Sequence, residues 1–170
     1  MWSWEGDPVA EATFTSLGLH PIPLSITDVI TSLQSGIING VYSPPLAAVA
    51  FQWHTRVNYM FDLPIANAMG AVIISKRFFN KLPEKYQKLL VEESKKYFSK
   101  ITEASRADNL KSIEVMKKQG IQVIKPFSAG EIQKFDAAGK TARRKLVGKL
   151  YSKEILDTVE KALDEYRKSH

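Results

Sequence analysis

Hydrophobic positions in the first part of the chain alternate between short extended runs and helical spacing. Residues 1–5 predict a short strand, and Asp7 and Pro8 then supply the cap and the first position of a helix that ends at Gly18. The prolines that follow keep residues 20–24 extended, because a residue that precedes proline is pushed out of the helical region. The pattern therefore begins as strand, helix, extended segment.

A second helix is predicted from apolar residues at helical spacing, with Ser25 or Thr27 as its cap and a stop between Gly36 and Gly40. The apolar positions of this helix are Ile26, Val29, Ile30, Leu33 and Ile37. Residues 41–43 are a strand end or a loop against the core, after which two prolines open a third helical segment over residues 46–53. Counted with residues 41–43 as a strand, the order is three strands alternating with three helices.

Two more strands are predicted at residues 57–64 and 70–75. The second contains Ala71–Ile74, an uninterrupted apolar run rich in β-branched residues, which is typical of a buried strand. Strands that alternate with helices indicate an α/β fold in which helices cover a sheet.

A long helix is predicted over residues 84–119, before a stop at Gly120. One side of it carries Tyr86, Leu89, Leu90, Tyr97, Ile101 and Ala104. Such a helix would be about 54 Å long, longer than a small domain is wide, so we expect a break or an overhang. A last strand is expected at residues 121–126, with helical segments from Ser128 to the end.

Composition is that of a soluble globular domain, with 170 residues of which 44% are apolar and 25% charged. No run approaches the ~18 consecutive apolar residues of a membrane-spanning helix, so the chain is not expected to cross a bilayer. The absence of cysteine excludes disulfides, thiolate metal sites and a cysteine nucleophile. The first residues lack a secretory signal, which predicts a protein that stays inside or a chain whose beginning is missing.

The net charge of +6 is unevenly distributed: residues 1–75 carry −4 and residues 76–170 carry +10. The densest basic cluster comprises Arg143, Arg144, Lys145, Lys149 and Lys153. Acidic residues are mixed among the lysines of this half, so we interpret it as solvated helix faces. The alternative is a patch that binds phosphate or an acidic partner, although without interleaved aromatic residues for base stacking.

Enzymatic chemistry has little support. His20, His54 and His170 are not paired at helical spacing, and the glycine-rich phosphate loops, the nucleophile elbow and the EF-hand loop are all absent. We therefore expect no catalytic residue, no metal ligand and no cofactor.

Aromatic residues gather in the acidic half, where strands are predicted to end and helices to begin. These residues are Trp2, Trp4, Tyr42 and Trp53. Ligand sites of open α/β sheets form at such ends, so the rings together suggest a pocket wall. Core packing is the alternative for each ring taken alone, because aromatic side chains bury large areas.

Four segments of the chain occur in a recognisable order: Trp2–Pro8, Leu17–Ser25 with its two prolines, Asp28–Gly40, and Ser75–Pro83 followed by Gln87. In this order they resemble the second half of a TRAP-transporter solute-binding protein of the DctP family. The resemblance covers most of the chain, is strongest over residues 1–87, and depends on the order of the segments.

This resemblance implies a type II periplasmic-binding-protein-like lobe with a long helix and C-terminal helices. The whole of residues 1–170 would be a single α/β unit, with the first lobe and signal peptide of the family absent. Such receptors close on a small organic acid or related solute and deliver it to the membrane permease subunits of the transporter. The implied location is the periplasm or another extracytoplasmic space.

Two departures from the family pattern bear on the ligand. Trp2 stands where the family carries a carboxylate-binding arginine, and Tyr42 and Ser43 stand where it carries an acid and an asparagine. The resemblance then implies a stacking, hydroxyl-lined site formed by Trp2, Trp4, Glu5, Tyr42 and Ser43. Carboxylate recognition would need a positive charge from the missing lobe or from a bound cation.

Two classes of function follow from the sequence. The first is a binding module that does not catalyse and does not bind nucleic acid, whose exposed apolar lobe interface would favour self-association. The second is a basic interaction protein that docks on nucleic acid or an anionic membrane surface. Salt dependence separates the two, because binding to phosphates weakens steeply with salt.

Overall fold

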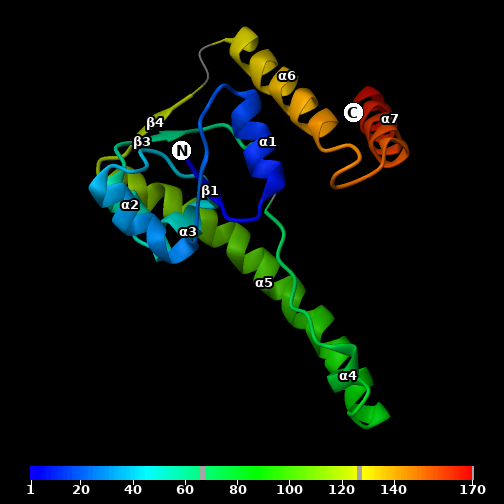
Figure 1. The fold of residues 1–170 in the computed structure, drawn as a ribbon. Coiled ribbons are helices and arrows are strands. Elements are labelled where there is room, and N and C mark those ends of the chain that lie inside the picture. Colours follow the sequence, from blue (N-terminus) through cyan, green and yellow to red (C-terminus); the bar gives the residue numbers. More distant parts are fainter. Residues whose placement is uncertain (66–67, 126–127, 170) are drawn as a thin grey trace. The chain divides into compact units, whose positions relative to one another are not determined.

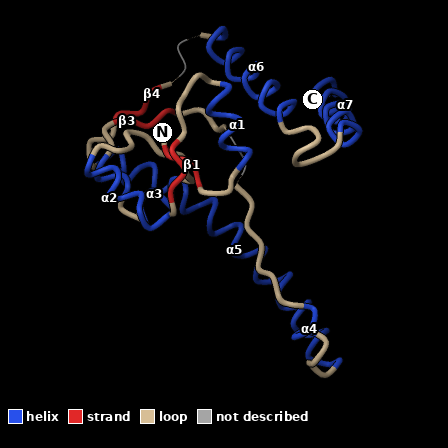
Figure 2. Tube along the Cα trace, in the orientation of Figure 1, coloured by secondary structure: helices blue, strands red, loops and turns tan. Residues whose placement is uncertain are grey.

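A computed structural model describes residues 1–65, 68–125 and 128–169 (Figures 1 and 2). By the contacts between its residues, the chain divides into two compact units. Unit 1 contains residues 1–42 and the chain from Ile124 onward, and unit 2 contains residues 43–123. The single α/β unit expected over residues 1–170 stays a prediction.

Unit 1 begins with a strand–helix–strand motif and is completed by the C-terminal helices. Its elements are β1 (Trp2–Trp4), α1 (Pro8–Ser16), β2 (Ile22–Leu24), the 3₁₀ helix η1 (Ile26–Asp28), α2 (Val29–Ser35), α6 (Ala129–Lys145) and α7 (Lys153–Ser169). Strands β1 and β2 are parallel, with Trp2 opposite Ile22 and Trp4 opposite Leu24. The predicted first strand, first helix and extended segment are confirmed.

The start of α1 follows the predicted chemistry. The Asp7 carboxylate accepts hydrogen bonds of 3.0 Å from the backbone N–H groups of Val9 and Ala10, and Pro8 occupies the first helical position. These bonds satisfy two donors that the first turn of a helix leaves without partners. Asp7 thereby fixes where β1 ends and α1 begins.

Helices α1 and α6 lie side by side in unit 1 (Figure 1). Ala10 and Phe14 of α1 and Ala138 and Ala142 of α6 are all buried, each pair being spaced four residues apart. Small side chains on facing helices allow close approach, and the aromatic ring fills the remaining space. Other buried side chains of this unit are Trp2, Val29, Ile38, Leu146 and Leu156.

The second predicted helix is shorter than expected. Ser25 precedes η1 and no side chain caps α2, while the predicted stop is confirmed because Gly36 adopts a φ of 76°. That left-handed residue ends the helical spacing. Ile37, which the spacing placed on this helix, lies beyond the end of α2 and is 59% exposed, whereas Ile38 is buried.

Unit 2 is built around one long helix. Its elements are α3 (Pro45–Ala50), the 3₁₀ helix η2 (Trp53–Arg56), β3 (Tyr59–Phe61), α4 (Lys76–Phe79), α5 (Glu84–Lys118) and β4 (Gln122–Ile124), whose last residue already counts with unit 1. Strands β3 and β4 pair with each other, so the described residues form two separate two-stranded sheets. Residues 41–43 form a loop, so the third strand of the predicted alternation is absent there.

Helix α5 extends over 35 residues as one continuous helix, so of the two expected alternatives, a break or an overhang, the break is absent (Figure 1). Its C-terminal half packs against α3, and Ser112 and Met116 in this half are buried. The Asn109 amide oxygen accepts a hydrogen bond of 2.9 Å from the backbone N–H of Leu46. On the apolar side of α5, Tyr86 and Tyr97 are exposed.

The prediction of a strand at residues 70–75 is wrong. The expected buried strand Ala71–Ile74 is not paired with any strand among the described residues, and Val72 and Ile73 are 78% and 90% exposed. A strand needs a neighbour to satisfy its backbone groups, and no described part of the chain supplies one. The last predicted strand is confirmed as β4, while its expected end at Pro126 lies outside the described residues.

Among the described residues, no helix combines the length and the apolar character that crossing a membrane requires.

Candidate functional site

A shallow hollow of about 180 Å³ lies in unit 1, beside the carboxyl end of β1. It is lined by Ser3, Trp4, Gly6, Asp7, Pro8, Glu11, Pro21 and Pro23. The hollow lies where the chain leaves a parallel strand and enters a helix, which is the position that ligand sites of α/β sheets occupy. Its charged lining residues are the two acids Asp7 and Glu11.

Trp4 is the aromatic wall of this hollow. Its side chain is 54% exposed, whereas its neighbours Trp2 and Ser3 are buried. Successive side chains of a strand point to opposite faces of the sheet. This rule puts Trp4 and Ser3 on opposite faces, but it would put Trp2 and Trp4 on the same face. Because β1 ends at Trp4, this residue lies at the margin of the sheet and keeps its indole in contact with solvent.

Trp2 belongs to the core of unit 1. It is 3% exposed, and its indole N–H donates a hydrogen bond of 3.0 Å to the carbonyl of Leu24 on the partner strand. Its ring lies 5.3 Å from the ring of Tyr42, and the Tyr42 ring contacts Phe14 edge-on at 5.0 Å. Three aromatic rings thus join β1, α1 and the loop after α2.

Tyr42 also makes a polar contact, because its hydroxyl donates a hydrogen bond of 2.9 Å to the second carboxylate oxygen of Asp7. Burial, with this hydrogen bond as the next cause, raises the pKa of Tyr42 to about 12. Asp7 therefore caps α1 with one oxygen and holds Tyr42 with the other.

Glu5 and Ser43 complete the predicted set. Glu5 is exposed and follows β1, with its backbone N–H directed to the carbonyl of Leu24 at 3.4 Å. Ser43 is partly exposed and is the first residue of unit 2. The structure thus brings Trp2 and Tyr42 into contact and places Trp4 in the hollow, and solute binding by all five residues stays a prediction.

Sequence reasoning did not select Asp7 or Glu11 as site residues. The Gly6-Asp7-Pro8 pattern identified the cap, but the contact with Tyr42 joins residues 35 positions apart and leaves no local signal. Glu11 lies one turn into α1, and its place in the hollow follows only from the packing of α1 beside β1.

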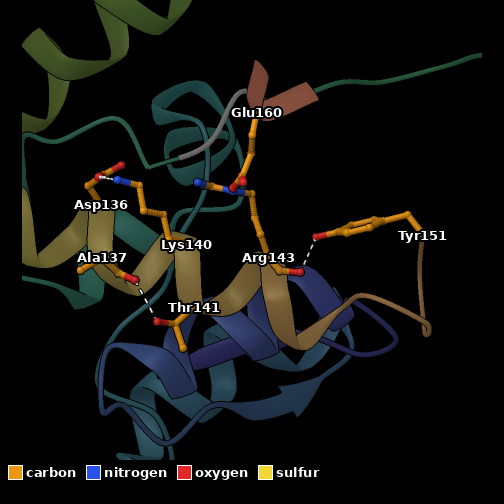
Figure 3. Close-up of polar contacts among 7 residues, drawn as sticks. All are labelled: Asp136, Ala137, Lys140, Thr141, Arg143, Tyr151 and Glu160. Atoms are coloured by element: carbon orange, nitrogen blue, oxygen red, sulfur yellow. Dashed lines mark hydrogen bonds and ion pairs between the residues drawn. The ribbon is translucent and has the colours of Figure 1, made fainter. Parts of the chain in front are cut away.

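Part of the basic cluster is engaged within unit 1 (Figure 3). The Arg143 guanidinium lies 3.2 Å from the carboxylate of Glu160 in α7, and the Lys145 ammonium donates a hydrogen bond of 3.1 Å to the Ser16 hydroxyl. The Arg143 carbonyl accepts a 2.7 Å hydrogen bond from Tyr151, which ties the loop between α6 and α7 to the helix. These contacts favour a structural role for this end of α6.

His54 is buried, and its Nδ1 lies 3.1 Å from the carbonyl of Ala48. His20 is exposed, and His170 lies outside the described residues.

Comparison with known proteins identifies a family whose sequence model matches this chain. The model of the DctP family, described as bacterial extracellular solute-binding protein, family 7, matches residues 4–150. No curated protein matches the chain.

Several solved structures share the fold. One is a TRAP periplasmic solute-binding protein from Desulfovibrio salexigens with bound orotic acid, which is 18% identical with a TM-score of 0.78, the match covering 96% of this chain and 52% of that one. A second, from Xanthobacter autotrophicus Py2 with bound β-D-galacturonate, is 20% identical with a TM-score of 0.78 and coverages of 94% and 51%.

A third such protein, from Desulfovibrio desulfuricans with bound sn-glycerol-3-phosphate, is 17% identical with a TM-score of 0.73 and coverages of 88% and 51%. The present chain therefore spans about half the length of these structures. The type II periplasmic-binding fold that the sequence resemblance implied is confirmed.

Proposed function

Because the chain belongs to the DctP family of bacterial extracellular solute-binding proteins, we propose that it forms part of the solute receptor of a TRAP transporter. The observation that carries this proposal is the family match over residues 4–150, supported by the fold shared with TRAP receptors. Since the chain spans about half the length of those structures, it supplies part of a receptor's solute site. The membrane permease subunits of such a transporter are its proposed partners.

The proposed solute is a small organic acid or a related polar molecule. Orotic acid, β-D-galacturonate and sn-glycerol-3-phosphate, which are bound in the three similar structures, are all small organic anions. In this chain the hollow presents the Trp4 indole and two acids. We propose that Trp4 stacks on a ring or an apolar face of the solute, while Glu11 accepts hydrogen bonds from hydroxyl groups. Glu5, which is exposed and follows Trp4 in the chain but does not line the hollow, is proposed as a second acceptor.

An anionic group of the solute is not held by this hollow. Asp7 and Glu11 would repel a carboxylate, and the aromatic Trp2 occupies a core position where it offers no positive charge. The charge of an organic acid is therefore met by a cation outside this hollow. Tyr42 acts behind the hollow by holding Asp7, so its proposed role is to position the end of β1.

The protein binds its solute and does not transform it, in this proposal. The family whose model matches is one of extracellular solute-binding proteins, which supports this part of the proposal. Its proposed location is the periplasm or another extracytoplasmic space, where the receptors with the shared fold act.

Thermal unfolding against a panel of mono- and dicarboxylates, sugar acids and sugar phosphates tests this proposal. A solute present at 100 times its dissociation constant stabilises the folded state by about 2.7 kcal/mol, which raises the melting temperature of a domain of this size by several degrees. We expect one solute class to do so, and Trp4→Ala to abolish the shift. No shift with any solute, for a chain that still melts cooperatively, contradicts solute binding by this chain alone.

Tyr86→Ala is the matched control for Trp4→Ala. Tyr86 and Trp4 are both aromatic and both 54% exposed, but Tyr86 belongs to α5 in unit 2 and is not among the residues that line the hollow. We expect Tyr86→Ala to leave the solute-dependent shift intact. Equal loss in both variants would show that the shift does not report on the hollow.

A further inference from the structure

The hollow beside β1 is lined by acidic side chains and by no basic one. Its charged lining residues are Asp7 and Glu11, and neither carboxylate forms an ion pair with any described residue. The first 55 residues of the chain, which supply the whole lining, contain neither lysine nor arginine. The hollow therefore holds negative charge that no described side chain neutralises.

The start of α1 does not make the hollow a site for anions. Free N–H groups at the start of a helix commonly bind an anion. Here the N–H groups of Val9 and Ala10 already donate to one carboxylate oxygen of Asp7. The other oxygen of Asp7 accepts the Tyr42 hydroxyl, so this carboxylate contributes charge to the hollow more than it contributes free acceptor positions.

Ser3 is a second and independent indication of a ligand. Its residue is 2% exposed, yet its hydroxyl makes no hydrogen bond with any described residue. In the described part of the chain, every side-chain nitrogen or oxygen that is completely buried has a hydrogen-bond partner. The Ser3 oxygen must therefore still reach solvent, and the hollow that Ser3 lines is the opening. A hydroxyl in this position is free to accept a hydrogen bond from a bound group.

The other walls of the hollow suit a cation that is attached to carbon. Trp4 presents a half-exposed indole, over which a cation is attracted by the ring electrons, and Pro8, Pro21 and Pro23 offer apolar surface for alkyl carbons. Glu11 is exposed and has no side-chain partner among the described residues, so it can accept a charge-assisted hydrogen bond.

The size of the hollow fits one functional group. Its volume of about 180 Å³ is below the roughly 300–1,000 Å³ of pockets that enclose a whole drug-sized ligand. It can therefore hold one end of a solute, while the rest of the solute lies outside it.

We propose that the hollow binds an alkylammonium group of the solute, whose N–H groups donate to Glu11 and Ser3 while the cation lies against Trp4. This inference rests on the proposed function and narrows its solute class. The solute then carries an acidic group, which a cation outside the hollow meets, and a protonated amine, which the hollow meets. It is a small zwitterion of the amino-acid type.

An NMR titration of the indole N–H signals tests the hollow directly on this chain. The chain contains three tryptophans, and Trp4→Phe identifies the signal of Trp4. Propylammonium chloride is the probe, and we expect it to shift the Trp4 signal saturably with a dissociation constant of about millimolar, as suits a ligand of so few atoms. The signal of Trp53, which is buried in unit 2, should stay in place.

Matched probes separate charge from shape. 1-Propanol and sodium propionate carry the same three-carbon chain without a cationic nitrogen, and sodium chloride controls for ionic strength. We expect none of them to reproduce the shift of the Trp4 signal. A shift of equal size with any of the three overturns the proposal, and so does a Trp4 signal that propylammonium leaves unmoved.

Glu11→Gln removes the charge of an exposed acid and keeps its shape, so the fold should stay intact, which the melting temperature will verify. We expect the dissociation constant of propylammonium to rise by about three- to tenfold. Glu103→Gln is the matched control, because Glu103 is exposed, belongs to α5 of unit 2 and does not line the hollow. It should leave the constant unchanged, and an equal rise in both variants would overturn the proposal.

The solute panel keeps this inference apart from the proposed function. Amino acids are added to the thermal unfolding panel beside hydroxy acids of the same chain length, such as 4-aminobutyrate beside 4-hydroxybutyrate. We expect any stabilising solute to carry a protonated amine. A stabilising solute without a cationic nitrogen overturns the inference and leaves the proposed function in place. If no solute stabilises the chain, solute binding by this chain alone is contradicted, and the propylammonium titration still decides what the hollow binds.

Discussion

Asp7 joins two parts of unit 1 that lie far apart in the sequence. One carboxylate oxygen accepts the first free N–H groups of α1, and the other accepts the Tyr42 hydroxyl. A carboxylate can serve both because each of its oxygens has two lone pairs. This single side chain therefore holds the helix start, the end of β1 and the loop after α2 in one arrangement beside the hollow.

We expect Asp7→Ala to destabilise the protein by about 2–3 kcal/mol, since the loss of an N-cap costs about 1 kcal/mol and an unsatisfied hydroxyl about 1–3 kcal/mol. Tyr42→Phe removes only the hydrogen bond and should cost about 1 kcal/mol. Urea unfolding of both variants measures the difference. An equal loss for both would show that the cap contributes nothing.

The raised pKa of Tyr42 predicts a pH dependence at alkaline pH. Its pKa is 10.0 in the unfolded chain and about 12 in the folded protein, so the folded state keeps the proton longer. The resulting stability is fully present below pH 10 and is lost as the pH rises from 10.0 to about 12. We expect the melting temperature to fall more steeply in this range for the original chain than for Tyr42→Phe. Parallel curves would contradict the prediction, because the other tyrosines and the lysines titrate in both proteins.

At the scale of elements, helix ends are set by local chemistry. Gly36 ends α2 with a φ of 76°, a conformation that costs most other residues about 1–2 kcal/mol. A Cβ atom at this position would meet nothing within 4 Å, so the backbone alone determines the cost.

We therefore expect Gly36→Ala to lower the free energy of unfolding by about 1 kcal/mol. Gly139→Ala is the opposite case, because Gly139 lies inside α6 with ordinary helical geometry and only van der Waals contact with Arg143. It should stabilise the protein by up to about 1 kcal/mol. Denaturant midpoints of the two variants measure the contrast, and a shift in the same direction for both would refute this account of the α2 terminus.

At the scale of the whole molecule, the net positive charge of residues 76–170 would favour binding to a nucleic acid, but the contacts of the basic side chains do not support it. Arg143 lies against Glu160, Lys145 bonds Ser16, and i,i+3 or i,i+4 ion pairs cover the exposed lysines of α5 at positions 88, 96, 111 and 117. Paired charges on helices produce a weaker field than a continuous basic patch.

We expect DNA or RNA binding to be weak at low salt and to disappear between about 50 and 200 mM salt, because unspecific phosphate contacts are lost in that range. The solute-dependent thermal shift should persist across it. Fluorescence anisotropy with a labelled oligonucleotide measures the first quantity. Tight binding that survives the higher salt would favour the alternative of a nucleic-acid partner.

Much of the fold could be predicted from short-range patterns. Asp7 and Pro8 mark the start of α1, Gly36 marks the end of α2, and α5 begins at Glu84 as expected. The candidate site could be predicted only in part, because Trp4 lines the hollow while Trp2 lies in the core. Both tryptophans have the same local pattern, and only the packing of α1 and the loop after α2 distinguishes them.

The sequence by itself determined the helix caps, the extended proline segment, the long helix and the resemblance to a receptor family. These features depend on residues a few positions apart, whose backbone preferences and hydrogen bonds act locally. Only the tertiary structure decided which apolar residues are buried. Ala71–Ile74 has the composition of a core strand but lies exposed, since burial requires a neighbouring strand and no described part of this chain provides it.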